Sequence, residues 1–258
     1  MKNFHVVDSA SHAYQFAWDN RQTIARYAAI PFAVKIGCLA LILLLEASNN
    51  YLRQGLLLLP AHFAEGWFVA TMVMICLHKI PNQSTLLPGG TLTQPQRLQG
   101  AVALYVLIQI LFAFLMHLVN DATPIADKTQ GAPVSPIELF GLIAALAFTI
   151  WAFRFTLVHI PIAMGYGFKR YARTFKTYNV SLRMIGLTML CTIPAALTMI
   201  ITLNALGNII DFESLNKTIT GLTLGSVQAL IQMPVLAISS AAMTYAFYPH
   251  LSGKSLKL

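Results

Sequence analysis

Charged residues are scarce in this chain, and their scarcity excludes an ordinary soluble domain. Only 10% of the 258 residues are Asp, Glu, Lys or Arg, and 57% are hydrophobic, whereas a typical globular domain has roughly 25% charged residues. Stretches of about 20 residues with few or no charges recur along the whole sequence, and each can cross about 30 Å of hydrocarbon. The composition therefore predicts an all-α, polytopic transmembrane helical bundle.

Cysteines and catalytic motifs are also lacking. The three cysteines fall inside apolar stretches, which is typical of small buried side chains and not of disulfides or metal ligands; they are Cys38, Cys76 and Cys191. The sequence contains no phosphate-binding loop, no zinc-protease motif and no nucleophile elbow. We therefore expect no catalytic residue, no metal site and no cofactor. The first 23 residues lack the pattern of a cleavable signal peptide, so we expect the first span to direct insertion.

Hydropathy predicts six spans, at 24–45, 56–77, 100–119, 137–166, 184–206 and 221–248. An amphipathic cytoplasmic segment, 1–23, precedes this bundle of residues 24–250, and a short cytoplasmic tail, 251–258, follows it. The fourth and sixth spans are longer than a bilayer requires, so we expect them to tilt, kink or project. A break at Arg154, or two half-helices around Pro234, would change the number of spans.

The distribution of basic residues predicts the orientation. With the N-terminus inside, the cytoplasmic segments hold twelve of the seventeen Lys and Arg residues and the outside segments hold three, while Lys35 and Arg154 lie within spans. Such an excess is the positive-inside signal of cytoplasmic loops. We therefore expect both termini on the cytoplasmic side of a bacterial inner membrane.

The N-terminal segment has the pattern of a short helix. Asp8 or Ser9 can cap a helix that runs to about Thr23. Small and aromatic residues recur at helical spacing along it: Ala10, Ala13, Tyr14, Ala17 and Trp18. This pattern fits an interfacial helix on the membrane surface and equally a helix packed on the cytoplasmic end of the bundle.

The segment between the fourth and fifth spans reads FKRYARTFKTYNVSLR and contains no acidic residue. An aromatic face and a basic cluster suit a helix lying on an anionic leaflet, where each basic residue contributes about 1 kcal/mol. The alternative is plain positive-inside topology, with the aromatic residues filling the bundle. The expected lipid surface consists of Phe168, Lys169, Arg170, Tyr171, Arg173, Phe175, Lys176 and Arg183. Nothing but charge supports nucleic-acid binding, which we do not expect.

Ionisable side chains at membrane depth are costly and usually mark a partner or a pathway. Glu65 lies 13 residues before His78, and Arg154 lies 13 residues before Gly167, so straight helices place both about 20 Å from the cytoplasmic boundary. This matching depth predicts a Glu65–Arg154 ion pair. Lys35 is expected to extend toward the cytoplasmic headgroups. A polar pathway is the further interpretation of the intramembrane polar residues His159, Lys35, Gln228 and Gln232.

Three stretches carry a family resemblance: SASHAYQFAWDNRQTIARYAAIPFAV at 9–34, FRFTLVHIPIAM at 153–164 and AMTYAFYPHL at 242–251. In layout the chain resembles a group of bacterial six-span inner-membrane proteins. It is similar to the membrane domain fused to some glycerophosphodiester phosphodiesterases. The resemblance implies an accessory or lipid-facing module, and it implies no phosphodiesterase activity because the chain lacks that domain.

Several functions fit these features. The first is a non-enzymatic membrane protein that acts as a scaffold or handles lipids at the inner leaflet, with anionic lipids as partners. The second is a small transporter or permease subunit that uses Glu65, Arg154 and His159. An accessory subunit, bound to another membrane protein or to a second copy, and a membrane-embedded lipid enzyme are further alternatives. A cavity that reaches the intramembrane charges would favour transport.

Overall fold

The computed structural model describes residues 5–47, 50–80, 92–122, 136–209 and 216–252, and within these ranges every regular element is a helix. The helices are α1 (Val6–Asp19), α2 (Arg21–Leu44), α3 (Tyr51–Leu57), α4 (Leu59–Lys79), α5 (Gln94–Ala122), α6 (Pro136–Thr156), α7 (His159–Ala163), α8 (Phe168–Thr174), α9 (Tyr178–Ile209) and α10 (Lys217–Ser252).

Six segments are long and apolar enough to cross a membrane. Five are single helices, namely α2, α4, α5, α9 and α10, and the sixth runs from Ile143 in α6 to Ala163 at the end of α7. The expected helical membrane protein with six spans is therefore confirmed at this level. Helix α10 continues through Pro234 as one helix, so the sixth span is not a pair of half-helices.

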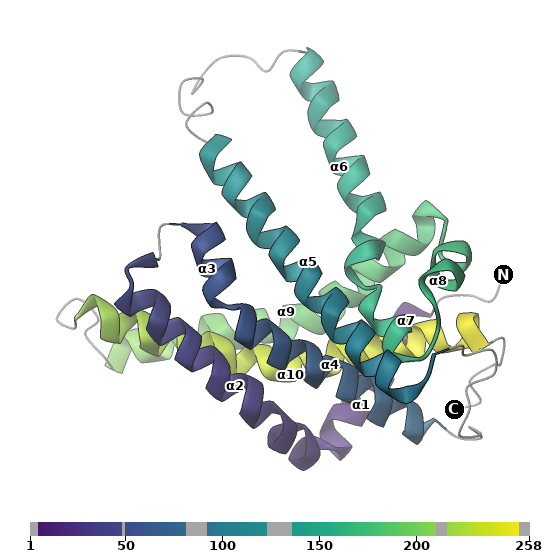
Figure 1. The fold of residues 1–258 in the computed structure, drawn as a ribbon, viewed down its shortest axis with the longest axis horizontal. Coiled ribbons are helices and arrows are strands. Elements are labelled where there is room, and N and C mark those ends of the chain that lie inside the picture. The colour runs from purple at the N-terminus through teal and green to yellow at the C-terminus, as the bar shows by residue number, and fades with distance from the viewer. Residues whose placement is uncertain (1–4, 48–49, 81–91, 123–135, 210–215, 253–258) are drawn as a thin grey trace.

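Helix α10 is the centre of the bundle. It packs against α1, α2, α4 and α9, and α5 joins the bundle through α3, α4 and α7, while α6 packs on α9 (Figure 1). The contact face of α10 carries fully buried alanines at Ala237, Ala241 and Ala242. Such small residues let helix backbones approach closely, which is how helices associate in a membrane that provides no hydrophobic driving force between them.

Helix α1 docks on the bundle at a proline. Pro194 in α9 has no N–H, so the carbonyl of Leu190, four residues earlier, loses its helical donor. The hydroxyl of Tyr14 donates to that carbonyl at 3.0 Å. Ala10 and Ala13 are buried on the same helix, whereas Trp18 is 71% exposed. The N-terminal segment is therefore a helix packed on α9 and α10, and a position in the membrane interface stays a prediction.

The fourth span breaks after Thr156, although its two helices together still form one segment long and apolar enough to cross a membrane. Helix α6 ends at Thr156, and α7 begins at His159 as a separate short helix that packs against α5. Pro161 lies inside α7, where it prevents a regular continuation of the preceding helix. Gly165 then adopts a φ of +95°, a conformation that side chains with a Cβ rarely take, and it turns the chain into α8.

Candidate functional site

Four helices meet at a charged cluster around Glu65, which is 1% exposed in α4. Its Oε1 atom lies 2.6 Å from the Lys35 ammonium of α2. Its Oε2 atom accepts a hydrogen bond of 3.1 Å from the Tyr105 hydroxyl of α5 and lies 3.4 Å from Nδ1 of His62. Lys35 also donates to the side-chain oxygen of Gln232 in α10. We call these five residues the intramembrane cluster.

The depth of the two charges explains why they meet. Lys35 lies 14 residues after Arg21 at the start of α2, and Glu65 lies 14 residues before Lys79 at the end of α4. Because a helix rises 1.5 Å per residue, both charges stand about 21 Å from the same end of the bundle. The expectation that Lys35 extends to the headgroups is therefore wrong, since its ammonium has a buried carboxylate partner.

A glycine brings Tyr105 within reach of the carboxylate. A β-carbon on Gly66 would lie only 3.2 Å from the Tyr105 Cβ and Cδ1 atoms, so even alanine would require α5 and α4 to move apart by a few tenths of an ångström. On the other side of Tyr105, the His159 ring packs edge-on with ring centroids 5.4 Å apart. Thus His159 adjoins the intramembrane cluster through Tyr105, whereas Gln228 is exposed on α10 and takes no part.

The cluster satisfies the requirements for charge in an apolar medium. Removing two ions from water costs several kcal/mol each, and a buried pair offsets this only when further hydrogen bonds complete both partners. Here the Glu65 carboxylate accepts hydrogen bonds from Lys35 and Tyr105, and the Lys35 ammonium also donates to Gln232. His62, three residues before Glu65 on the same helical face, is a partner that the sequence spacing could have indicated.

Arg154 is not the partner of Glu65, so the predicted Glu65–Arg154 pair is wrong. The guanidinium of Arg154 donates to the carbonyl of Phe175 at 2.9 Å, and its Cζ atom lies 4.5 Å from the ring centroid of Trp151. The depth estimate assumed one straight helix from Arg154 to Gly167. The chain instead breaks after Thr156, and Arg154 reaches the turn that follows α8.

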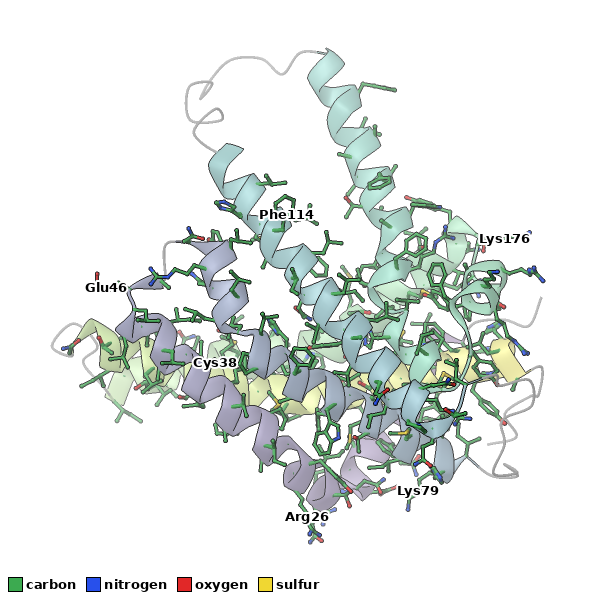
Figure 2. All side chains as sticks on the ribbon, viewed as in Figure 1. Arg26, Cys38, Glu46, Lys79, Phe114 and Lys176 are labelled. Atoms are coloured by element: carbon green, nitrogen blue, oxygen red, sulfur yellow. The ribbon has the colours of Figure 1, made fainter. Side chains whose placement is uncertain are left out.

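The expected lipid surface between the fourth and fifth spans is only partly exposed. Helix α8 ends at Thr174, and Tyr171 and Phe175 are buried against Phe247 of α10, with ring centroids 5.8 and 4.9 Å away. These two aromatic residues fill the bundle and do not face lipid. The remaining members are exposed or, for Arg183, half-buried: Phe168, Lys169, Arg170, Arg173, Lys176 and Arg183. Figure 2 shows Lys176 at the periphery of the molecule.

Two apolar grooves flank α10 at Pro234. The first, about 320 Å³, lies between α2 and α10, with Ala17 of α1 beside it. The second, about 360 Å³, lies between α9 and α10 and reaches Tyr14 of α1. Leu230 and Pro234 line both grooves. Neither groove is lined by a residue of the intramembrane cluster.

Among the described residues, no group of three His, Cys, Asp or Glu side chains is placed to hold a metal ion. No protein-family model, curated protein or solved structure matches the chain.

The Lys35–Glu65 ion pair predicts that substitutions of its two residues have non-additive effects on the stability of the protein. Lys35→Met and Glu65→Gln should each lower the unfolding temperature in detergent, because each leaves a buried polar group without its partner, at a cost of about 3–5 kcal/mol. The double variant should be far more stable than the sum of the two losses implies. The matched cycle of Glu65→Gln with Arg154→Gln should be additive. Additive losses for Lys35 and Glu65, or coupling between Glu65 and Arg154, would contradict this assignment.

Proposed function

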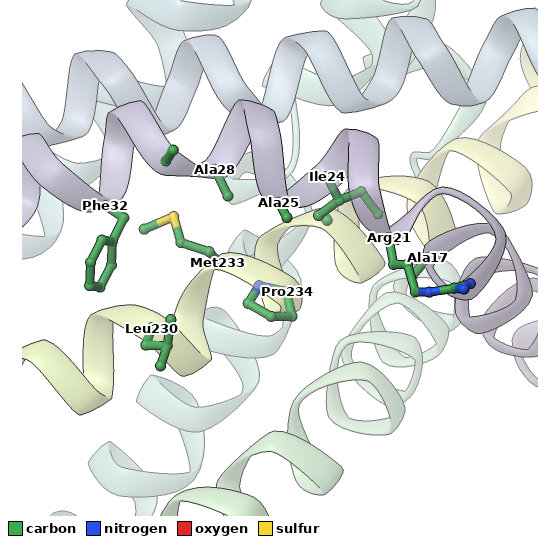
Figure 3. Close-up of a pocket in the computed structure, with 11 residues that line it drawn as sticks. Ala17, Arg21, Ile24, Ala25, Ala28, Phe32, Leu230, Met233 and Pro234 are labelled. Atoms are coloured by element: carbon green, nitrogen blue, oxygen red, sulfur yellow. The ribbon is translucent and has the colours of Figure 1, made fainter.

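We propose that this integral membrane protein is a non-enzymatic lipid-handling protein that holds an anionic phospholipid of the cytoplasmic leaflet. The observation that carries the proposal is the groove between α2 and α10, with a basic residue at one end (Figure 3). We call it the α2–α10 groove.

The lining of the α2–α10 groove suits an acyl chain. It consists of small and apolar side chains apart from Arg21: Ala17, Ile24, Ala25, Ala28, Ala29, Phe32, Leu230, Met233, Pro234 and Ala237. From Arg21 to Phe32 the groove follows α2 for 11 residues, which is about 16 Å. This length is about half of the ~30 Å hydrocarbon core and thus corresponds to one leaflet.

The polar end of the α2–α10 groove suits an anionic headgroup. Arg21 is exposed and lies with its Cζ atom 5.2 Å from the ring centroid of Trp18, to whose carbonyl it donates at 3.0 Å. An exposed Trp beside a basic residue is typical of the headgroup level of a membrane. The formal net charge of +8 adds a general attraction to anionic lipids.

The orientation in this proposal places both termini in the cytoplasm of a bacterium. It is supported by the excess of basic residues in the predicted cytoplasmic segments, two of which, Arg26 and Lys79, lie far from the acidic Glu46 in Figure 2. Helix α1 packs against α10, and the ring centroids of His12 and Tyr245, seven residues before the end of α10, lie 5.7 Å apart, in agreement with an even number of spans.

Labelling of single cysteines tests this orientation. The Lys176→Cys variant should react with a membrane-impermeant maleimide only in inside-out vesicles. The Arg53→Cys variant should react only in cells whose outer membrane is permeabilised and whose inner membrane is intact. The natural Cys38, Cys76 and Cys191 are buried and provide the unlabelled background. The reverse pattern of labelling would reject the cytoplasmic leaflet as the location of the α2–α10 groove.

Transport is a second candidate function, and the intramembrane cluster is the observation that favours it, because ionisable groups at membrane depth often mark pathways. The two grooves contain none of the cluster residues, so they provide no route to the charges. The geometry therefore supports lipid handling better than transport.

Filling the α2–α10 groove should displace lipid. Ala25→Phe should abolish the tightly bound phospholipid detected by native mass spectrometry, whereas Ala33→Phe, an exposed position on α2 outside the groove, should leave it bound. Arg21→Gln should reduce the ratio of anionic to zwitterionic bound lipid about fivefold, because one basic residue contributes about 1 kcal/mol. Arg53→Gln removes the same charge elsewhere and should have no effect. Equal lipid retention in all four variants would count against the proposal.

A further inference from the structure

A second polar cluster lies at Tyr166, in the turn between α7 and α8. The Tyr166 side chain is fully buried, and its hydroxyl has no hydrogen-bond partner among the described residues. Buried polar groups are almost always hydrogen-bonded, so a buried hydroxyl without a partner requires an explanation.

Two arginines from different helices surround this tyrosine. The Cζ atom of Arg170, in α8, lies 4.9 Å from the Tyr166 ring centroid, and its guanidinium also donates to the carbonyl of Leu251 near the end of α10. Arg97, in the first turn of α5, lies against Gly165: a β-carbon there would be 2.7 Å from the Arg97 Nε atom. Only a glycine therefore permits this approach.

The electrostatics point to an anion. Burial raises the pKa of Tyr166, while the positive charges of Arg170 and Arg97 lower it, so both guanidiniums act on the same hydroxyl. An anion that accepts a hydrogen bond from this hydroxyl would also be attracted by both positive charges.

We propose that a phosphate group binds between Arg97 and Arg170, with the Tyr166 hydroxyl as a third donor. Guanidiniums recognise phosphate through paired N–H donors. Among the described residues, the only hydrogen bond that Arg97 donates is from its Nε–H to the Leu92 carbonyl, at 3.1 Å. The N–H groups of its two terminal nitrogens can therefore donate to a ligand. Because the Tyr166 hydroxyl is buried, phosphate binding requires that the long Arg97 or Arg170 side chain moves aside. The phosphate belongs either to a phosphomonoester lipid headgroup or to free inorganic phosphate.

This phosphate site shares no residue with the α2–α10 groove, so the two proposals can fail separately. The test uses the full chain in phosphatidylcholine nanodiscs. Inorganic phosphate is titrated by calorimetry, and in a second arm phosphatidic acid replaces a minority of the phosphatidylcholine and its retention is measured by native mass spectrometry. Arg97→Gln removes the charge and the guanidinium donors of Arg97, and Tyr166→Phe removes one hydroxyl donor. Arg26→Gln, an exposed position on α2, is the matched charge control.

Arg97→Gln should weaken phosphate binding about tenfold or more, and Tyr166→Phe about fivefold, as expected for hydrogen bonds to a charged ligand. Arg26→Gln should change it less than about twofold. Binding of inorganic phosphate with this pattern identifies free phosphate, and the same pattern only with phosphatidic acid identifies a headgroup. If Arg97→Gln does not fold, Arg97→Lys, which keeps the charge but loses the paired donors, replaces it. Absence of binding in both arms, an unchanged affinity in Tyr166→Phe, or an equal loss in Arg26→Gln would overturn the proposal.

Discussion

The ion pair between Lys35 and Glu65 is the constraint on which the arrangement of the bundle depends. A charge without a partner in the membrane interior is costly, so α2 and α4 can pack only in the register that brings these two side chains together. Tyr105 and Gln232 add α5 and α10 to the same point. The register of α2 against α10, once fixed in this way, also determines the shape of the α2–α10 groove.

A second type of interaction attaches the shorter helices at the ends of the spans. In each case a side chain donates to a backbone carbonyl near a helix end or a proline, where helical donors are fewer. Tyr14 binds the Leu190 carbonyl ahead of Pro194, Arg154 binds the carbonyl of Phe175 after α8, and Arg170 binds Leu251 in the last turn of α10. The polar residues near the membrane ends thereby connect α1, α8 and the end of α10 to the bundle.

The number of spans could be predicted from the sequence because it depends on local hydropathy and length. The identity of the charged partners could not, because it depends on which helices are neighbours and on where a helix breaks. Lys35 and Glu65 were both recognisable as costly charges, yet the break after Thr156 removed Arg154 from the depth that a straight helix gives it. The aromatic spacing at 168–178 was misleading for the same reason, since α8 ends at Thr174 and turns Phe175 inward. The family resemblance and the lipid surface stay predictions.

Solid-state NMR of the protein in lipid bilayers tests the central pair most directly. With ¹⁵N in the lysine ammonium groups and ¹³C in the glutamate carboxylates, the 2.6 Å contact between Lys35 and Glu65 should produce strong dipolar dephasing of one carboxylate signal. That dephasing should disappear in Lys35→Met and persist in Arg154→Gln. A carboxylate signal without dephasing, or dephasing that survives Lys35→Met, would contradict the central role of this ion pair.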